Sequence, residues 1–96
     1  MAAGRDSAAS SPVRRIVITG ASSGLGRALA TELALRFPGS TMLLLARRAD
    51  RLAELAADLP QVQCVCETVD ITDHERLSGI CRRFVTEHGA PDIVIA

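Results

Sequence analysis

The sequence contains no Lys, Asn, Tyr or Trp, and all eleven of its basic residues are Arg. Chemistry that needs a phenol, a lysine ammonium group or an asparagine amide therefore cannot be supplied by these 96 residues. An excess of charge of one sign is also absent, because eleven acidic residues balance the arginines. Binding to nucleic acid or to a membrane surface needs a basic excess on one face, so the composition argues against both.

Cysteines and long apolar runs are scarce as well. The three cysteines, Cys64, Cys66 and Cys81, do not make an even disulfide framework, and the first residues carry no apolar segment of a signal peptide. The longest near-continuous apolar run, residues 42–46, is far too short to cross a bilayer. We therefore expect a cytoplasmic protein with reduced thiols.

Cys64 and Cys66 also raise the question of a metal site, because their spacing places both on one face of a strand. The remaining soft ligands nearby in sequence are Cys81, His74 and His88, and no tight four-ligand spacing joins them. We interpret the cysteines as small buried hydrophobic residues and predict no metal site.

Residues 1–11 are rich in Ala and Ser and predict a flexible N-terminal tail. Residues 12–96 predict one domain with a core, since 48% of the chain is apolar. Within this domain, short apolar segments alternate with segments of helical periodicity. The predicted strands are residues 16–18, 41–46, 62–69 and 92–96.

Three helices are predicted between these strands from apolar residues at steps of three and four. They end at Pro38-Gly39, at Pro60 and before Gly89. Thr72-Asp73-His74-Glu75 fits a capping box with Thr72 as N-cap of the third helix. The residues expected to be buried in the three helices are, in order, Leu25, Ala28, Leu29, Leu33 and Phe37; Leu52, Leu55, Ala56 and Leu59; and Leu77, Ile80, Phe84 and Val85.

Apolar strands that alternate with helices predict an α/β fold, with a parallel sheet covered by helices on each side. Right-handed crossovers then give a doubly wound, Rossmann-like sheet with strand order 3-2-1-4. The winding reverses at the fourth strand, residues 92–96, where the sequence stops. We therefore expect a fragment of a longer protein, truncated after the fourth strand.

The turn after the first strand carries three glycines with the spacing Gly20-x-x-x-Gly24-x-Gly26. Gly20 lets the strand turn sharply, and Gly24 and Gly26 let the backbone approach a phosphate at the start of the helix. Ser22 and Ser23 add hydroxyl groups without bulk. No Lys follows the last glycine, so the segment is not a P-loop. The turn predicts a pyrophosphate site.

The segment Thr19–Gly26 resembles the Thr-Gly-x-x-x-Gly-x-Gly cofactor loop of the short-chain dehydrogenase/reductase family, and the resemblance extends over residues 13–96. Ala46-Arg47-Arg48 follows the second strand, where family members carry the residue that recognises the ribose. Asp70-Ile71 ends the third strand, where a family Asp binds the adenine edge. The resemblance implies a cofactor site made of Gly20, Ser22, Ser23, Gly24, Leu25, Gly26, Arg47, Arg48, Asp70 and Ile71.

The cofactor we expect is NADP(H) rather than NAD(H). An acidic residue after the second strand would bind both ribose hydroxyls and repel a 2′-phosphate, but Ala46 stands there. Arg47 can hold a phosphate through charge-assisted hydrogen bonds worth about 1.5–3 kcal/mol. For Arg48, a place on a solvated helix face beside Asp50 is an equal alternative, and for Arg47 the same place is the less favoured alternative. The alternative for Asp70 is an ordinary strand-end or capping residue.

The resemblance implies hydride transfer between a nicotinamide and a small-molecule carbonyl or alcohol, and a homo-oligomeric full-length protein. The family uses a Tyr, a Lys, a Ser and an Asn for catalysis, and we assign no catalytic residue within this sequence. Two alternatives stay open. One is a non-catalytic nucleotide-binding module of the same fold. The other is a different doubly wound enzyme such as a methyltransferase, in which an acidic residue would be expected in place of Ala46-Arg47.

Overall fold

The computed structural model describes residues 14–96, so the predicted tail at residues 1–11 lies outside the described part. Three helices and four strands follow one another in strict alternation after the first strand. They are β1 (Arg15–Thr19), α2 (Gly24–Arg36), β2 (Thr41–Ala46), α3 (Ala49–Ala57), β3 (Gln63–Thr68), α4 (His74–His88) and β4 (Ile93–Ile95). No helix within residues 14–96 is long and apolar enough to cross a membrane.

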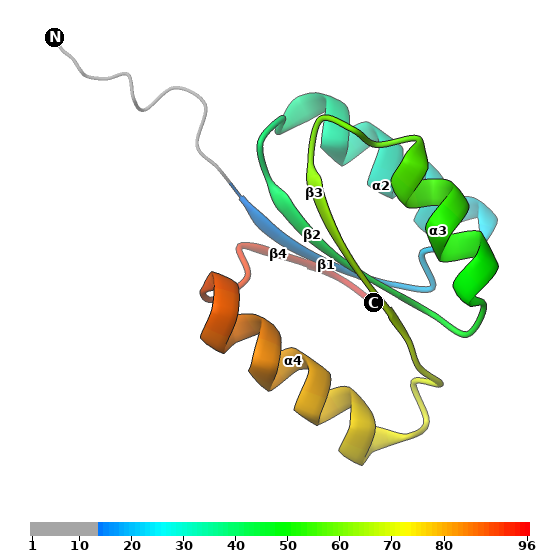
Figure 1. Cartoon of the computed structure of the whole chain (residues 1–96), viewed down its shortest axis with the longest axis vertical. Coiled ribbons are helices and arrows are strands. Elements are labelled where there is room, and N and C mark those ends of the chain that lie inside the picture. The colour runs from blue at the N-terminus through cyan, green and yellow to red at the C-terminus, as the bar shows by residue number, and fades with distance from the viewer. Residues whose placement is uncertain (1–13) are drawn as a thin grey trace, which may run out of the picture.

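The four strands form one parallel sheet in the order β3-β2-β1-β4, as the sequence predicts. Helices α2 and α3 cover one face of the sheet, and α4 covers the opposite face (Figure 1). Because the strands are parallel, their carboxyl ends meet at one edge of the sheet. The turn after β1 and the segments that follow β2 and β3 are therefore brought together there.

Two apolar cores lie on the two faces of the sheet, and β1 and β2 contribute to both because their successive side chains alternate between the faces. Burial of each large aliphatic side chain contributes about 1.5–3 kcal/mol. The core under α2 and α3 includes Ile16, Ile18, Met42, Leu44, Leu52 and Leu55. The core under α4 consists of Val17, Leu43, Leu45, Val69, Ile80 and Phe84.

The buried face of α2 differs from the sequence prediction. Leu25 is 75% exposed and Ala28 is exposed, whereas Gly26, Ala30 and Ala34 are buried against the sheet. The spacing of these three small residues places them on one side of the helix. Their size lets the helix axis approach the strands closely, and the larger predicted residues flank this face half-buried. The prediction is confirmed in part, because Leu33 and Phe37 pack against the core, and it was wrong for the exposed Leu25 and Ala28.

The start of α4 is a second correction. Asp73, not Thr72, is the N-cap, and its side chain accepts a hydrogen bond from the Arg76 backbone N–H at 3.2 Å. Thr72 is engaged elsewhere, because its N–H and hydroxyl both donate to the Asp70 carboxylate, at 2.9 and 2.8 Å. On the same helix Val85, predicted to be buried, is 44% exposed.

The Asp73 N-cap should stabilise the protein by a measurable amount. Replacing Asp73 with Ala should lower the free energy of unfolding by about 1 kcal/mol, because an N–H group of the first turn loses its acceptor. Denaturant unfolding of the full-length protein measures this change. Asp73→Ser retains an acceptor, so it should lower the free energy of unfolding by at most about 0.3 kcal/mol. Equal losses for the two variants would show that the side-chain acceptor at residue 73 does not stabilise the helix.

The cysteines are less buried than the sequence suggests. Cys64 is half-buried against the core under α3, whereas Cys66 is exposed. The reason is the position of β3, which is an outer strand of the described sheet and is only partly covered. Burial, with a smaller effect of the neighbouring Cys66 thiol, raises the pKa of Cys64 to about 11. Within residues 14–96, no three His, Cys, Asp or Glu side chains are grouped so that they could hold a metal ion.

Candidate functional site

An open pocket of about 390 Å³ lies where the carboxyl ends of β1, β2 and β3 meet. Three segments that are distant in sequence form its walls: the glycine turn after β1, the arginines after β2 and the acidic residue after β3. The lining residues are Gly20, Ser22, Ser23, Ala46, Arg47, Arg48, Val69, Asp70 and Ile71. Seven of these nine were predicted from the sequence to bind the cofactor.

The glycine turn is held in shape by two close backbone contacts. Gly20 has φ +65°, in the left-handed region that favours glycine. A Cβ built on Gly26 would lie 2.1 Å from the Gly20 carbonyl oxygen, so the helix can approach the turn only when residue 26 has no side chain. The Ala21 N–H donates to the Leu45 carbonyl oxygen at 3.1 Å and ties the turn to the end of β2.

The first turn of α2 leaves backbone N–H groups available to a ligand. Ser23 occupies the N-cap position, but its hydroxyl donates to the Gly20 carbonyl oxygen at 2.8 Å instead of accepting from the helix. No acidic residue stands in this first turn. The unpaired N–H groups and the positive end of the helix dipole therefore follow directly on Ser23, which lines the pocket, and this arrangement suits an anion such as a pyrophosphate.

A second depression, of about 270 Å³, lies on the other side of the glycine turn toward β4. Leu25 and Gly26 line it together with Thr19, Leu29 and Ile95. The exposure of Leu25 follows from this position, since its side chain borders a depression instead of the core. Gly24 lines neither cavity.

The two arginines after β2 differ in their contacts. Arg48 is held by Asp50, with Nε 3.1 Å from Oδ1 and Nη2 2.9 Å from Oδ2, and this pairing raises the pKa of Arg48 and lowers the pKa of Asp50. Arg47 has no hydrogen-bond or ion-pair partner among residues 14–96. It does act electrostatically on Asp70 across the pocket. Arg47 is therefore the cation available to an anionic ligand.

Asp70 is oriented by its own loop. The Thr72 N–H and hydroxyl both donate to Oδ1 of Asp70, and these bonds, with a smaller effect of Arg47, hold the pKa of Asp70 below its usual value. The carboxyl group is therefore ionised at neutral pH and accepts hydrogen bonds. Oδ2 makes no bond within residues 14–96, which leaves it available to a donor such as an exocyclic amine.

Sequence reasoning missed three residues of this region. Val69 is buried and forms part of the pocket wall; its position directly before Asp70 at the end of a strand was the available signal. Thr72 orients Asp70, and the spacing Asp-x-Thr, which is typical of a side-chain-to-backbone turn, could have indicated it. Arg76, outside the pocket, donates hydrogen bonds to the Thr68 carbonyl oxygen at the start of the loop between β3 and α4, and no sequence pattern indicates this contact.

The chain is similar in sequence and in fold to known proteins. A family model described as short chain dehydrogenase matches residues 14–96. An uncharacterised oxidoreductase of Mycobacterium tuberculosis is 41% identical over 86 residues, which cover 85% of this chain and 33% of that protein. The NADPH-dependent pterin aldehyde reductase of Arabidopsis thaliana is 37% identical over 83 residues, which cover 85% of this chain and 34% of that enzyme.

A solved structure supports the same grouping. L-sorbose reductase from Gluconobacter frateurii, crystallised with NADPH and L-sorbose, superposes with a TM-score of 0.75 at 33% identity, over 85% of this chain and 32% of that one. The chain thus spans about a third of the length of the curated relatives it matches. The matched third contains the glycine turn and the segments that follow β2 and β3.

Proposed function

Because the chain belongs to the short-chain dehydrogenase family, we propose that the protein containing it is an NADP(H)-dependent oxidoreductase that interconverts a carbonyl and an alcohol. Residues 12–96 would form the N-terminal part of its cofactor-binding domain. The observation that carries the choice of NADP(H) is Arg47, a cation without an intramolecular partner in the described chain, at the end of a strand that carries no acidic residue there.

Each wall of the pocket would bind a different part of the dinucleotide. The first-turn N–H groups of α2 would bind the pyrophosphate, and Gly26 keeps the backbone close enough for that contact. Arg47 would pair with the 2′-phosphate, and the free carboxylate oxygen of Asp70 would accept a hydrogen bond from the adenine amine. When bound, the nicotinamide would donate a hydride to a carbonyl carbon in its reduced form, or accept one from an alcohol carbon in its oxidised form.

The relatives support this assignment. The Arabidopsis enzyme is named for its dependence on NADPH and its action on a pterin aldehyde, and the sorbose reductase was crystallised with NADPH and a sugar. Both act with small molecules that carry a carbonyl or hydroxyl group. We infer a substrate of that broad class, and a homo-oligomeric cytoplasmic protein stays our prediction for the full-length chain.

Activity of the full-length protein tests the proposal. NADPH should be oxidised, followed by its absorbance, when a panel of aldehydes and ketones is supplied, and NADH should be oxidised much more slowly. A protein that binds NADPH but transfers hydride to or from no member of a broad panel would favour the alternative of a nucleotide-binding module. A protein that binds neither dinucleotide would contradict the proposal.

The pairing of Arg48 with Asp50 predicts unequal roles for the two arginines. Arg48→Ala should weaken NADPH binding by no more than about threefold, since a guanidinium already held by an exposed carboxylate has little to add, on the scale of an exposed ion pair. Isothermal titration calorimetry on the full-length variant measures the dissociation constant. A loss of tenfold or more, on the scale of a charge-assisted hydrogen bond of roughly 1.5–3 kcal/mol, would show that Arg48 leaves Asp50 for the phosphate.

A further inference from the structure

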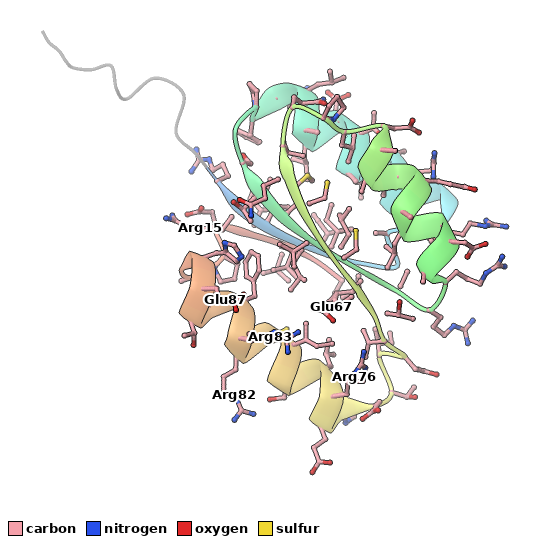
Figure 2. The ribbon with its side chains drawn as sticks, viewed as in Figure 1. Arg15, Glu67, Arg76, Arg82, Arg83 and Glu87 are labelled. Atoms are coloured by element: carbon pink, nitrogen blue, oxygen red, sulfur yellow. The ribbon has the colours of Figure 1, made fainter. Side chains whose placement is uncertain are left out.

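Arg76 stands at an unfavourable place for a cation. It is the third residue of α4, where the positive end of the helix dipole disfavours a guanidinium. Its side chain turns back from the helix and donates two hydrogen bonds to the Thr68 carbonyl oxygen, from Nε at 3.2 Å and from Nη2 at 2.7 Å. Figure 2 shows Arg76 beside the loop that joins β3 to α4, away from Arg82 and Arg83 further along the helix.

The Thr68 carbonyl is an acceptor that the sheet itself does not use. The Val69 N–H donates to the Ala46 carbonyl oxygen of β2 at 2.9 Å. Because the carbonyl of Thr68 and the N–H of Val69 belong to one trans peptide group, they point in opposite directions. The Thr68 carbonyl therefore faces the outer edge of β3, and Arg76 occupies that edge.

Arg76 is hydrogen-bonded to both ends of the loop that joins β3 to α4. The Arg76 N–H is bound by the Asp73 side chain at the end of the loop, and the Arg76 guanidinium is bound to Thr68 at its beginning. The segment between them, residues 69–72, carries Asp70 and Ile71 into the pocket wall. Packing fixes only its first residue, since Val69 is 3% exposed whereas Ile71 is 53% exposed.

We propose that Arg76 is a positioning residue for dinucleotide binding: it holds the 69–72 segment so that Asp70 and Ile71 present the adenine-binding wall. The inference rests on the proposed function. Arg76 lines neither cavity, so it acts through the loop and not by contact with the ligand. Loss of its side chain frees one end of the loop, and the ordering of the segment must then be supplied by the ligand when it binds.

The chain offers a matched control in Arg83. This arginine lies on the same helix and also ties α4 to β3, through an ion pair with Glu67 at 2.6 Å (Figure 2). Its contact is separated from the 69–72 segment, so it tests whether any loss of helix anchoring has the same effect. Arg76→Lys is the conservative variant, because a lysine retains the charge and a donor for Thr68 but cannot form both bonds.

The experiment compares Arg76→Ala, Arg76→Lys and Arg83→Ala in the full-length protein by calorimetry with NADPH and with NADH. Arg76→Ala should raise both dissociation constants by about 5- to 10-fold, on the scale of one ordinary hydrogen bond, and leave their ratio unchanged. Arg76→Lys should recover part of the loss, and Arg83→Ala should change neither constant by more than about twofold.

Amide hydrogen exchange of the ligand-free protein gives a second readout. The Thr72 and Asp73 amides are bonded to Asp70, and they should exchange faster in Arg76→Ala but not in Arg83→Ala. Unchanged dissociation constants in Arg76→Ala, or equal losses in Arg83→Ala, would overturn the positioning role while leaving NADP(H) binding intact. A wild-type protein that binds neither dinucleotide would instead overturn the proposed function.

Discussion

Replacing Gly26 with Ala should destabilise the domain by about 3 kcal/mol, at the upper end of the range for overpacking. The added Cβ would lie 2.1 Å from the Gly20 carbonyl oxygen and 2.8 Å from its carbonyl carbon, and both are backbone atoms that cannot rotate away. The helix and the glycine turn must separate by more than an ångström. Because that shift moves the first-turn N–H groups, we also expect NADPH affinity to fall by about 10- to 100-fold, the loss of one charge-assisted hydrogen bond to the pyrophosphate.

Gly79 provides the control for this substitution. It lies on the exposed side of α4, has no atom within 4 Å of a built Cβ and has no positive φ. Gly79→Ala should therefore stabilise the protein by about 0.5–1 kcal/mol, because alanine restricts the unfolded chain. Thermal and denaturant unfolding of both variants measure the difference, and calorimetry measures the affinity. A Gly26→Ala protein as stable as wild type would contradict the tight contact between helix and turn.

Replacing Arg47 with Asp should reverse the cofactor preference. The substitution removes a charge-assisted hydrogen bond to the 2′-phosphate and places a like charge beside it, so NADPH should bind about 100-fold more weakly. A carboxylate at this position can accept hydrogen bonds from both ribose hydroxyls, so NADH should bind more tightly than in the wild type. Dissociation constants for both dinucleotides, measured by calorimetry on the full-length variant, give the change in their ratio.

Arg51→Asp is the matched control for this charge change. Arg51 lies on α3 and lines neither cavity, so the same change in net charge occurs away from the pocket. The ratio of the two dissociation constants should stay within about twofold of wild type, because Arg51 is not among the lining residues and an exposed charge without direct contact to the ligand has little effect. Unchanged selectivity in Arg47→Asp, or an equal change in Arg51→Asp, would contradict the role of Arg47.

The layout of the site could be predicted because it depends on features that sequence patterns express directly. Buried strands such as residues 41–46 show as short apolar runs, and alternation with helices fixes a parallel sheet. Parallel strands bring their carboxyl ends together, so residues that follow strands, such as Arg47 and Asp70, must meet. The glycine spacing of residues 20–26 then indicated that the turn after the first strand, which leads into α2, belongs to the site.

The details that sequence patterns missed depend on contacts between distant segments. The buried face of α2 is set by the distance of Gly26 from the turn, and apolar periodicity favours the larger Leu25 instead. Thr72 and Asp73 are both good helix caps. Because the Thr72 N–H and hydroxyl donate to the Asp70 carboxylate, Asp73 becomes the N-cap. Arg76 is one exposed arginine among several in the sequence, and only the open edge of β3 shows what it binds.

If this pocket holds a dinucleotide by its 2′-phosphate, the dinucleotide that carries this phosphate must bind more tightly than the one that lacks it. Calorimetry on the full-length wild-type protein, at one salt concentration, should give a dissociation constant for NADPH at least about tenfold lower than for NADH, the advantage expected from one charge-assisted contact to Arg47. Equal constants, or tighter binding of NADH, would contradict the assignment.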